Sequence, residues 1–391
     1  MKKKGGLPLA FSASRVLGTL PILALICVNA HGQTTSARID AMLAKWNQKD
    51  APGMAAMLIR NGQIAYSKSF GLADLDTRAP ITPDTQFRLA SVTKQFTAMA
   101  IMILVEQRKL RFDDTLAKFC PEFPDYAKTI TIRNLLNHTS GLPEYEGHLA
   151  GKLDDSYFRS SKSPRAAHEF TSAEVLQFLS RQKELRFPTG TKFEYSNGGY
   201  VVLAQIVERV SGERYADFLK ENIFDPLGMH DTLVVDERNQ KVQQLALGYE
   251  KRNGQWQDVS YSPENNVYGE DGVFSTVNDL YKWDQALYTE RLVGHSILEM
   301  AVTPGRTNDG KEIETDILKR GNLPNSYGFG WFISSLDGAT DVEHSGGWAG
   351  YVSDILRVPS RRITAIVLSN SANMEVPKIA EQMVEIEIGG R

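Results

Sequence analysis

The clearest pattern along the chain is a long, almost wholly apolar segment in its first third. Residues Phe96–Val105 read FTAMAIMILV, so apolar side chains would cover nearly every face of a helix. A helix of that composition is usually buried on all sides. We therefore predict a helix of about twenty residues that begins at Ser91 and runs through the middle of the molecule.

Strand signals lie toward the two ends of the chain. Near the N-terminus, two strand-like runs, Met54–Arg60 and Gln63–Phe70, flank Asn61-Gly62, the pair that most favours a type I′ hairpin. Near the C-terminus, short apolar runs separated by turn residues predict further strands at Tyr327–Ile333, Val342–His344, Tyr351–Val358 and Ile363–Ser369.

Between these ends the periodicity is mainly helical. Helices are expected at Ala37–Trp46, Val175–Leu179, Tyr200–Val210, Tyr215–Ile223, from the capping sequence at Thr276, and at Val376–Ile388. Strands at both ends with helices between them indicate an α/β (α+β) fold. We expect one antiparallel sheet built from the N- and C-terminal segments and flanked by helices, with a mainly helical lobe of approximately residues 91–240 inserted. The seam between the two lobes is a natural place for a pocket.

The first thirty residues have the organisation of a secretory signal peptide. A basic start at Lys2–Lys4 precedes an apolar run, Val16–Val28, and Val28-Asn29-Ala30 places small residues before a cleavage point. A membrane anchor is the alternative, but the run is short for about 30 Å of hydrocarbon and Pro21 interrupts it. We predict cleavage after Ala30, a catalytic domain of residues 31–391, and a secreted or periplasmic protein without stable membrane insertion.

Composition narrows the classes of function. The chain is 42% hydrophobic and 9% aromatic, which is typical of globular proteins, and its net charge of −3 argues against nucleic acid as a partner. Signal removal would take away Cys27, leaving Cys120 as a small, partly buried side chain and no disulfide. The histidines lack the spacing of a metal site, so we expect no metal and no cofactor.

The strongest local signal for chemistry is Ser91-Val92-Thr93-Lys94. Residues three apart share a helix face, so the Lys94 amine can reach the Ser91 hydroxyl. An apolar setting would lower the pKa of Lys94 and let it help to activate the serine. Backbone N–H groups at the helix start could also hold a developing oxyanion. The alternative is a helix-capping serine beside a solvated lysine.

Two further motifs follow. Tyr195-Ser196-Asn197 lies in a glycine-flanked loop, where Tyr195 could relay protons and Asn197 could hydrogen-bond a substrate amide. The alternative is a loop with a capping serine and a packed tyrosine. His344-Ser345-Gly346-Gly347 comes at the end of a predicted strand, where glycines allow close approach of a substrate. An isolated histidine there is most often a packed or hydrogen-bonded residue.

Together, Ser-x-x-Lys, Tyr-x-Asn and a glycine-rich strand motif resemble the serine β-lactamase and penicillin-binding-protein superfamily. Within it, the chain is similar to the branch of class C β-lactamases, D-aminopeptidases and esterases. The resemblance covers roughly Ile39–Ile388. It is supported by stretches that are mostly structural in that family: Leu135–Leu142, Phe193–Tyr200, Asp225–Met229 and Gly272–Thr276.

The resemblance implies a role for each motif. Ser91 would be the acylated nucleophile, Lys94 its activating partner and Tyr195 the proton shuttle. Asn197 would orient the substrate beside the strand His344-Ser345-Gly346-Gly347, and the backbone N–H groups of Ser91 and Gly347 would form the oxyanion hole. We do not expect His138 to be catalytic.

His344 departs from the family pattern, because β-lactamases and transpeptidases usually carry a lysine at this position. A histidine is mostly neutral at pH 7 and supplies no fixed charge for a substrate carboxylate. We therefore expect an ester, amide or small-peptide substrate. The alternatives are a true β-lactamase or D,D-carboxypeptidase, and a non-catalytic penicillin-binding-like sensor module. The role of segment 144–170 and the oligomeric state are not predicted.

Overall fold

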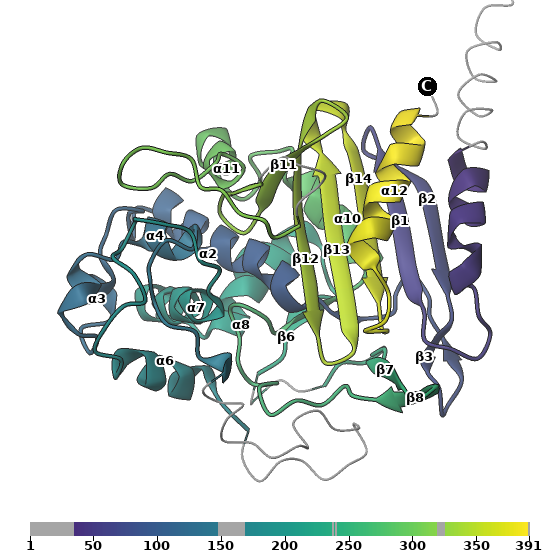
Figure 1. The fold of residues 1–391 in the computed structure, drawn as a ribbon, viewed down its shortest axis with the longest axis horizontal. Helices are drawn as coiled ribbons and strands as arrows, with labels where there is room; N and C mark the ends of the chain where they lie inside the picture. Colours follow the sequence, from purple (N-terminus) through teal and green to yellow (C-terminus); the bar gives the residue numbers. More distant parts are fainter. Residues whose placement is uncertain (1–34, 148–168, 237, 239–240, 319–324, 390–391) are drawn as a thin grey trace, which may run out of the picture.

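The computed structural model describes residues 35–147, 169–236, 238, 241–318 and 325–389. The expected signal peptide and most of segment 144–170 lie outside these residues. The main element is an antiparallel sheet of seven strands in the order β10-β11-β12-β13-β14-β1-β2 (Figure 1). The strands are β1 (Met54–Arg60), β2 (Gln63–Phe70), β10 (Ser326–Tyr327), β11 (Phe332–Leu336), β12 (Ala339–Trp348), β13 (Tyr351–Val358) and β14 (Ile363–Ser369).

The sheet joins the two ends of the chain, as the strand pattern predicted. β1 pairs with β14, with Met54 opposite Ser369, and with β2 through the expected hairpin. At its turn, Asn61 and Gly62 have φ angles of 52° and 77°, the positive values that a type I′ turn requires. The expectation of an α/β fold with one antiparallel sheet built from both termini is therefore confirmed.

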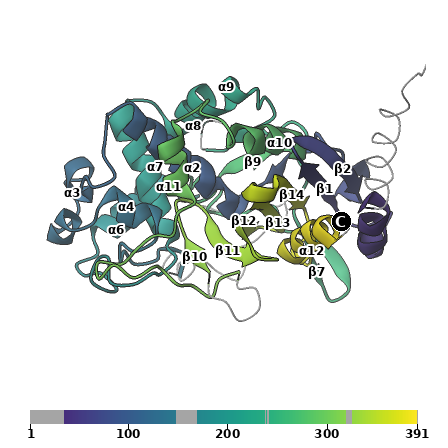
Figure 2. The same cartoon turned by 90° about the horizontal axis from the view of Figure 1, so that it is seen from above.

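Each face of the sheet carries its own hydrophobic core, because successive side chains of a strand point to opposite faces. On β1, Met54, Ala56 and Leu58 join the smaller core, together with the helix of residues 35–43 and α12 (Val376–Gly389). The intervening residues of β1 join the larger core, on the side of α10 (Val277–Ala286). Figure 2 shows α10 and α12 on opposite sides of the sheet.

The predicted central helix is α2 (Lys94–Glu106), in which every residue from Lys94 to Leu104 is buried. It is shorter than expected. Ser91 belongs to a preceding 3₁₀ turn, Ala90–Thr93, which the chain enters through Ala90 at a φ of 47°. At the other end, Arg108 adopts a φ of 57°, and the chain leaves the helix there.

Most of the other helices contact α2 or its neighbour, the helix Asn197–Ser211. These other helices are α3 (Leu116–Phe119), α4 (Ile132–Leu136), α6 (Ser172–Ser180), α7 (Asn197–Ser211), α8 (Tyr215–Leu219), α9 (Asp225–Leu227) and α11 (His295–Ala301). Short helical turns are Ala44–Trp46, Asp125–Lys128, Lys220–Phe224 and Pro359–Arg361. Three small sheets are formed by β3 (Leu72–Asp74) with β4 (Ala79–Pro80), by β5 (Phe87–Arg88), β9 (Val273–Ser275) and β6 (Leu233–Val234), and by β7 (Tyr249–Arg252) with β8 (Gln255–Asp258).

Two strand predictions are wrong in their extents. The strand expected at Val342–His344 continues as β12 to Trp348, because Gly346 and Gly347 pair with β13. The strand expected at Tyr327–Ile333 is two strands, β10 and β11, separated by a turn. Gly330 in that turn has a φ of 76°, and a side chain on it would lie 2.9 Å from the carbonyl oxygen of Lys94.

Cys120 is fully buried, whereas we expected partial burial. Burial raises the pKa of its thiol to about 12, which fits a packing role. Across the part of the chain that the structure describes, no helix is long and apolar enough to span a bilayer. The same described residues hold no group of three His, Cys, Asp or Glu side chains placed to bind a metal ion.

Candidate active site

Ser91 lies where the 3₁₀ turn before α2 meets strand β12. Its hydroxyl is 3.1 Å from the Lys94 amine, so the two residues share a face as their spacing predicted. Ser91 is partly exposed, whereas the Lys94 side chain has no exposed surface. This contrast leaves the hydroxyl open to a substrate while its neighbour is shielded from bulk water.

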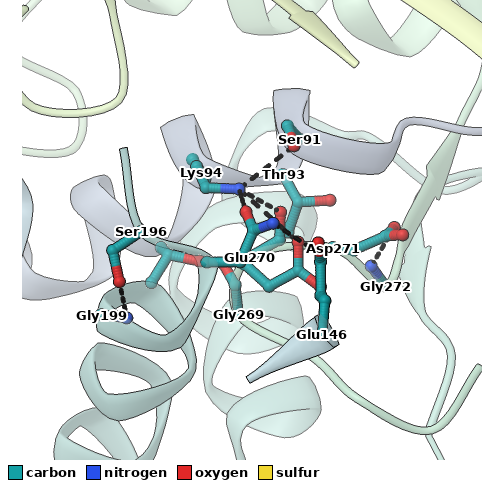
Figure 3. A network of polar contacts seen from close by, with 12 residues as sticks. Ser91, Thr93, Lys94, Glu146, Ser196, Gly199, Gly269, Glu270, Asp271 and Gly272 are labelled. Atoms are coloured by element: carbon teal, nitrogen blue, oxygen red, sulfur yellow. Dashed lines mark hydrogen bonds and ion pairs between the residues drawn. The ribbon is translucent and has the colours of Figure 1, made fainter. Parts of the chain in front are cut away.

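The Lys94 ammonium is held by three acceptors from three parts of the chain. It donates to Ser91 Oγ and to the carbonyl oxygen of Glu270, each at 3.1 Å (Figure 3). It also donates to Asn197 Oδ1 at 2.7 Å. An ammonium has three N–H donors, so these three contacts match its donor capacity, and Tyr195 also interacts with the amine. Ser91 accepts from Lys94, and its own proton is therefore directed to another partner.

The surroundings of Lys94 differ from the apolar setting that we expected. Burial lowers the pKa of the Lys94 amine, but the nearby Tyr195, Glu270 and Glu146 outweigh burial and raise it. Glu270 Oε2 lies 3.5 Å from the amine. Lys94 is therefore cationic at rest, and the lowered pKa that we expected for it is wrong.

Tyr195 lies at the end of the loop that leads into α7, beside Lys94. The Lys94 amine is 4.8 Å from the centre of the tyrosine ring, which stacks on Phe332 at a centroid distance of 6.2 Å. Burial raises the pKa of the Tyr195 phenol, while Lys94 and a hydrogen bond with Ser91 act to lower it. The phenol therefore contacts both the serine and the cation, as a proton relay requires.

The next two residues of this motif begin α7. The Ser196 hydroxyl accepts from the N–H of Gly199 at 3.1 Å and caps the helix. Asn197 bonds Lys94 through its oxygen, while its side-chain nitrogen donates to Glu146 Oε1 at 2.7 Å. Asn197 therefore positions Lys94, and Glu146 takes one of the two side-chain N–H donors of Asn197.

His344 is buried on β12 and held in one neutral form. Its Nδ1 lies 2.7 Å from the carbonyl oxygen of Ser345, which can only accept, so Nδ1 carries the proton. Its Nε2 then accepts from the Tyr327 hydroxyl at 3.0 Å. Burial and the charge of Lys94 lower the pKa of His344 to about 3. This position therefore supplies no positive charge at neutral pH.

The remaining residues of the third motif differ in their exposure. Ser345 is half-buried, Gly346 is buried and Gly347 is exposed. An added Cβ on Gly346 would lie 2.2 Å from the Leu89 carbonyl oxygen and 2.8 Å from the Ser91 backbone nitrogen. Gly346 is therefore what allows β12 to lie directly against the turn that carries Ser91.

Sequence reasoning missed the carboxylates around Lys94. Glu144 accepts from the backbone N–H of Asn197 at 2.9 Å, Glu146 bonds the side chain of Asn197, and Glu270 faces Lys94. Burial raises the pKa of all three carboxyl groups. In the sequence, these glutamates are distinguished only by their glycine or apolar neighbours, which are a weak indication of a buried carboxylate.

His138, which we did not expect to be catalytic, lies among aromatic rings. Its Nδ1 accepts from the backbone N–H of Ser196 at 3.1 Å, and its ring centre is 4.4 Å from that of Tyr195. Burial and the charge of Lys94 lower its pKa well below the usual value. Its contacts support the Tyr195 loop and do not reach Ser91.

Ser91, Lys94 and Tyr195 lie together at the N-terminal end of the buried α2, beside an antiparallel sheet, and this arrangement resembles that of β-lactamase-like serine hydrolases. The Beta-lactamase family model matches residues 36–388, and the chain belongs to this family. It is 35% identical to penicillin-binding protein 4* of Bacillus subtilis over 350 residues, which cover 86% of this chain and 72% of that protein.

Two solved structures share the fold. An octameric penicillin-binding protein homologue from Pyrococcus abyssi superposes with a TM-score of 0.78 and 28% identity, over 90% of this chain and 77% of that one. A penicillin-binding protein from Bacillus halodurans superposes with a TM-score of 0.72 and 26% identity, over 89% of this chain and 98% of that one.

Proposed function

We propose that the protein hydrolyses esters or small amides through a covalent acyl-enzyme on Ser91. The observation that carries this proposal is the convergence on one partly exposed hydroxyl of a buried ammonium at 3.1 Å and the Tyr195 phenol. A serine hydroxyl becomes an effective nucleophile when neighbouring groups take up its proton. Neither Ser91 as a helix cap nor Lys94 as a solvated residue fits this geometry.

The proposed reaction has two halves. Once the Lys94–Tyr195 pair has lost a proton to solvent, Ser91 Oγ attacks the carbonyl carbon and its proton passes to the neutral Lys94 amine or the Tyr195 phenolate, while the backbone N–H groups of Ser91 and Gly347 stabilise the oxyanion. Collapse expels an alcohol or amine, which takes up that proton. Water then attacks the acyl-enzyme by the same route, releasing the carboxylic acid and restoring the Ser91 hydroxyl.

The charges around the site favour substrates without a carboxylate near the scissile bond. His344 is neutral, and Glu144 and Glu146 hydrogen-bond Asn197, the residue that we propose orients the substrate. A second carboxylate placed there would be repelled. A neutral ester or amide, or a small peptide with a free amine, therefore fits better than a β-lactam or a D,D-peptide.

A fluorophosphonate probe tests the acyl-enzyme directly. Intact mass should increase by one adduct, peptide mapping should place it on Ser91, and Ser91→Ala should abolish both labelling and hydrolysis of p-nitrophenyl acetate. Hydrolysis that continues unchanged in Ser91→Ala would overturn the proposal. Faster turnover of nitrocefin than of the ester would favour the β-lactamase alternative. Stable labelling without turnover of any ester or peptide would favour a sensor module.

We also propose that the protein is exported and works as residues 31–391, with the helical lobe of approximately residues 91–240 inserted. Support for export comes from the basic and apolar segments before Ala30. Mass spectrometry of the protein recovered outside the cytoplasm should give an N-terminus at His31. Recovery of an intact Met1 terminus would contradict the proposed cleavage.

A further inference from the structure

Glu270 contacts the Lys94 ammonium through both its backbone and its side chain. Its backbone carbonyl accepts from the amine at 3.1 Å, and its carboxylate Oε2 lies 3.5 Å from the same nitrogen (Figure 3). The other carboxylate oxygen accepts from the Tyr145 hydroxyl at 3.0 Å. The residue is 8% exposed, so water screens this pair poorly.

Lys94 is the cation that directly faces the Glu270 carboxylate. Arg88 is also close, but it is bound by Asp271 at 2.9 Å, so these two residues largely balance each other. Asp271 and Glu146 add negative charge near the Glu270 carboxyl group, as does Glu144 from the same loop as Glu146.

Three phenols also face this carboxyl group. Tyr145 bonds it directly, and Tyr195 and Tyr215 interact with its charge. Burial raises the pKa of Glu270 to about 7, so its charge changes within the range of neutral pH. An ionised Glu270 in turn raises the pKa values of Lys94 and Tyr195.

We propose, building on the function above, that Glu270 is a positioning residue that sets the pH at which Ser91 becomes activated. Activation requires a group that can take the Ser91 proton, which is either neutral Lys94 or the Tyr195 phenolate. A negative charge 3.5 Å from the Lys94 amine keeps that amine protonated, and it also opposes the phenolate. Neutral Glu270 removes both effects.

The test is the pH dependence of fluorophosphonate labelling at Ser91, followed as a second-order rate constant in the wild type and in Glu270→Gln. The amide keeps the shape of the side chain and removes its charge. We expect the acid limb of the profile to move by about one pH unit or more toward lower pH, giving roughly tenfold faster labelling below the wild-type midpoint. Glu270→Asp should return the limb toward the wild-type position.

Two further variants keep the test decisive. Tyr145→Phe removes a hydrogen bond that lowers the pKa of Glu270, so it should shift the limb in the same direction by less, even if Glu270→Gln does not fold. Glu122→Gln removes a carboxylate from an exposed pair with Arg209 and should leave the limb in place.

The outcomes separate this inference from the proposed function. Absence of Ser91 labelling in the wild type would overturn the function. Labelling with the same midpoint in the wild type, Glu270→Gln and Tyr145→Phe would leave the function standing and overturn the role of Glu270. A uniform loss of rate at every pH in Glu270→Gln would also overturn it, because a purely structural role predicts that result.

Discussion

Replacing Gly346 with alanine tests how closely strand β12 approaches the nucleophile turn. The new methyl carbon would lie 2.2 Å from the Leu89 carbonyl oxygen, 2.8 Å from the Ser353 hydroxyl and 2.8 Å from the Ser91 backbone nitrogen. Two of these three atoms are backbone, and Ser353 already donates to the Leu89 oxygen at 2.6 Å. Relief therefore requires the strand and the turn to separate by about 1 Å, since unstrained carbon–oxygen contacts need at least about 3 Å.

The expected changes in stability and in labelling rate follow from that displacement. Overpacking of a well-packed interior costs about 1–3 kcal/mol, so the free energy of unfolding should fall by at least this much. A displacement of about 1 Å at a reacting group can lower the rate roughly 100-fold, so labelling of Ser91 should fall more than the loss of stability alone would explain. Urea unfolding gives the first quantity, and fluorophosphonate labelling of the folded protein gives the second.

The adjacent glycine is a matched control for stability. An added Cβ on Gly347 would meet no atom within 4 Å, and this position is exposed. Gly347→Ala should therefore change the free energy of unfolding by no more than about 0.5 kcal/mol. If Gly346→Ala unfolds at the same urea concentration as the wild type and is labelled at the same rate, the close approach that we infer is incorrect.

Three other experiments probe separate parts of the structure. Asp271→Asn removes the carboxylate that binds the buried Arg88, and urea unfolding should show that the free energy of unfolding falls by about 3–5 kcal/mol; a fall below about 1 kcal/mol would contradict this pairing. Cys120, with a pKa of about 12 and no exposed surface, should react with a thiol reagent at pH 8 only after denaturation, and fast reaction of the native protein would show the burial to be wrong. His344→Gln should leave the shape of the pH profile of Ser91 labelling unchanged between pH 5 and 8, because the pKa of His344 is about 3. If the wild-type profile has a limb near pH 6.5 that is absent in the variant, His344 titrates there.

The sequence predicted the fold well where hydrophobic periodicity and turn chemistry agree. The hairpin at Asn61-Gly62 is one example, and the buried α2 is another. The extents of β12 and α2 were not predictable from local pattern. Glycine is rare within strands, but Gly346 lies in β12 because only glycine leaves room for Leu89 and Ser91. That constraint comes from a contact between segments far apart in sequence.

The sequence likewise predicted only part of the candidate site. The spacing of Ser91 and Lys94 placed their side chains together, because it depends only on local geometry. The expected pKa of Lys94 was wrong, because it depends on Glu146 and Glu270, which come from distant loops. A carboxylate in a loop has no sequence signature that separates a buried partner of lysine from a solvated residue.

The neutral His344 and the carboxylates around Lys94 have a common electrostatic consequence. In this chain, Lys94 is the cation beside Ser91, and its donors are already committed to Ser91, Asn197 and Glu270. A substrate carboxylate would therefore have to displace one of these bonds while being repelled by Glu146. A neutral or amine-bearing substrate requires neither change. If nitrocefin and p-nitrophenyl acetate acylate Ser91 at equal rates in low salt, where such repulsion is least screened, this electrostatic argument fails.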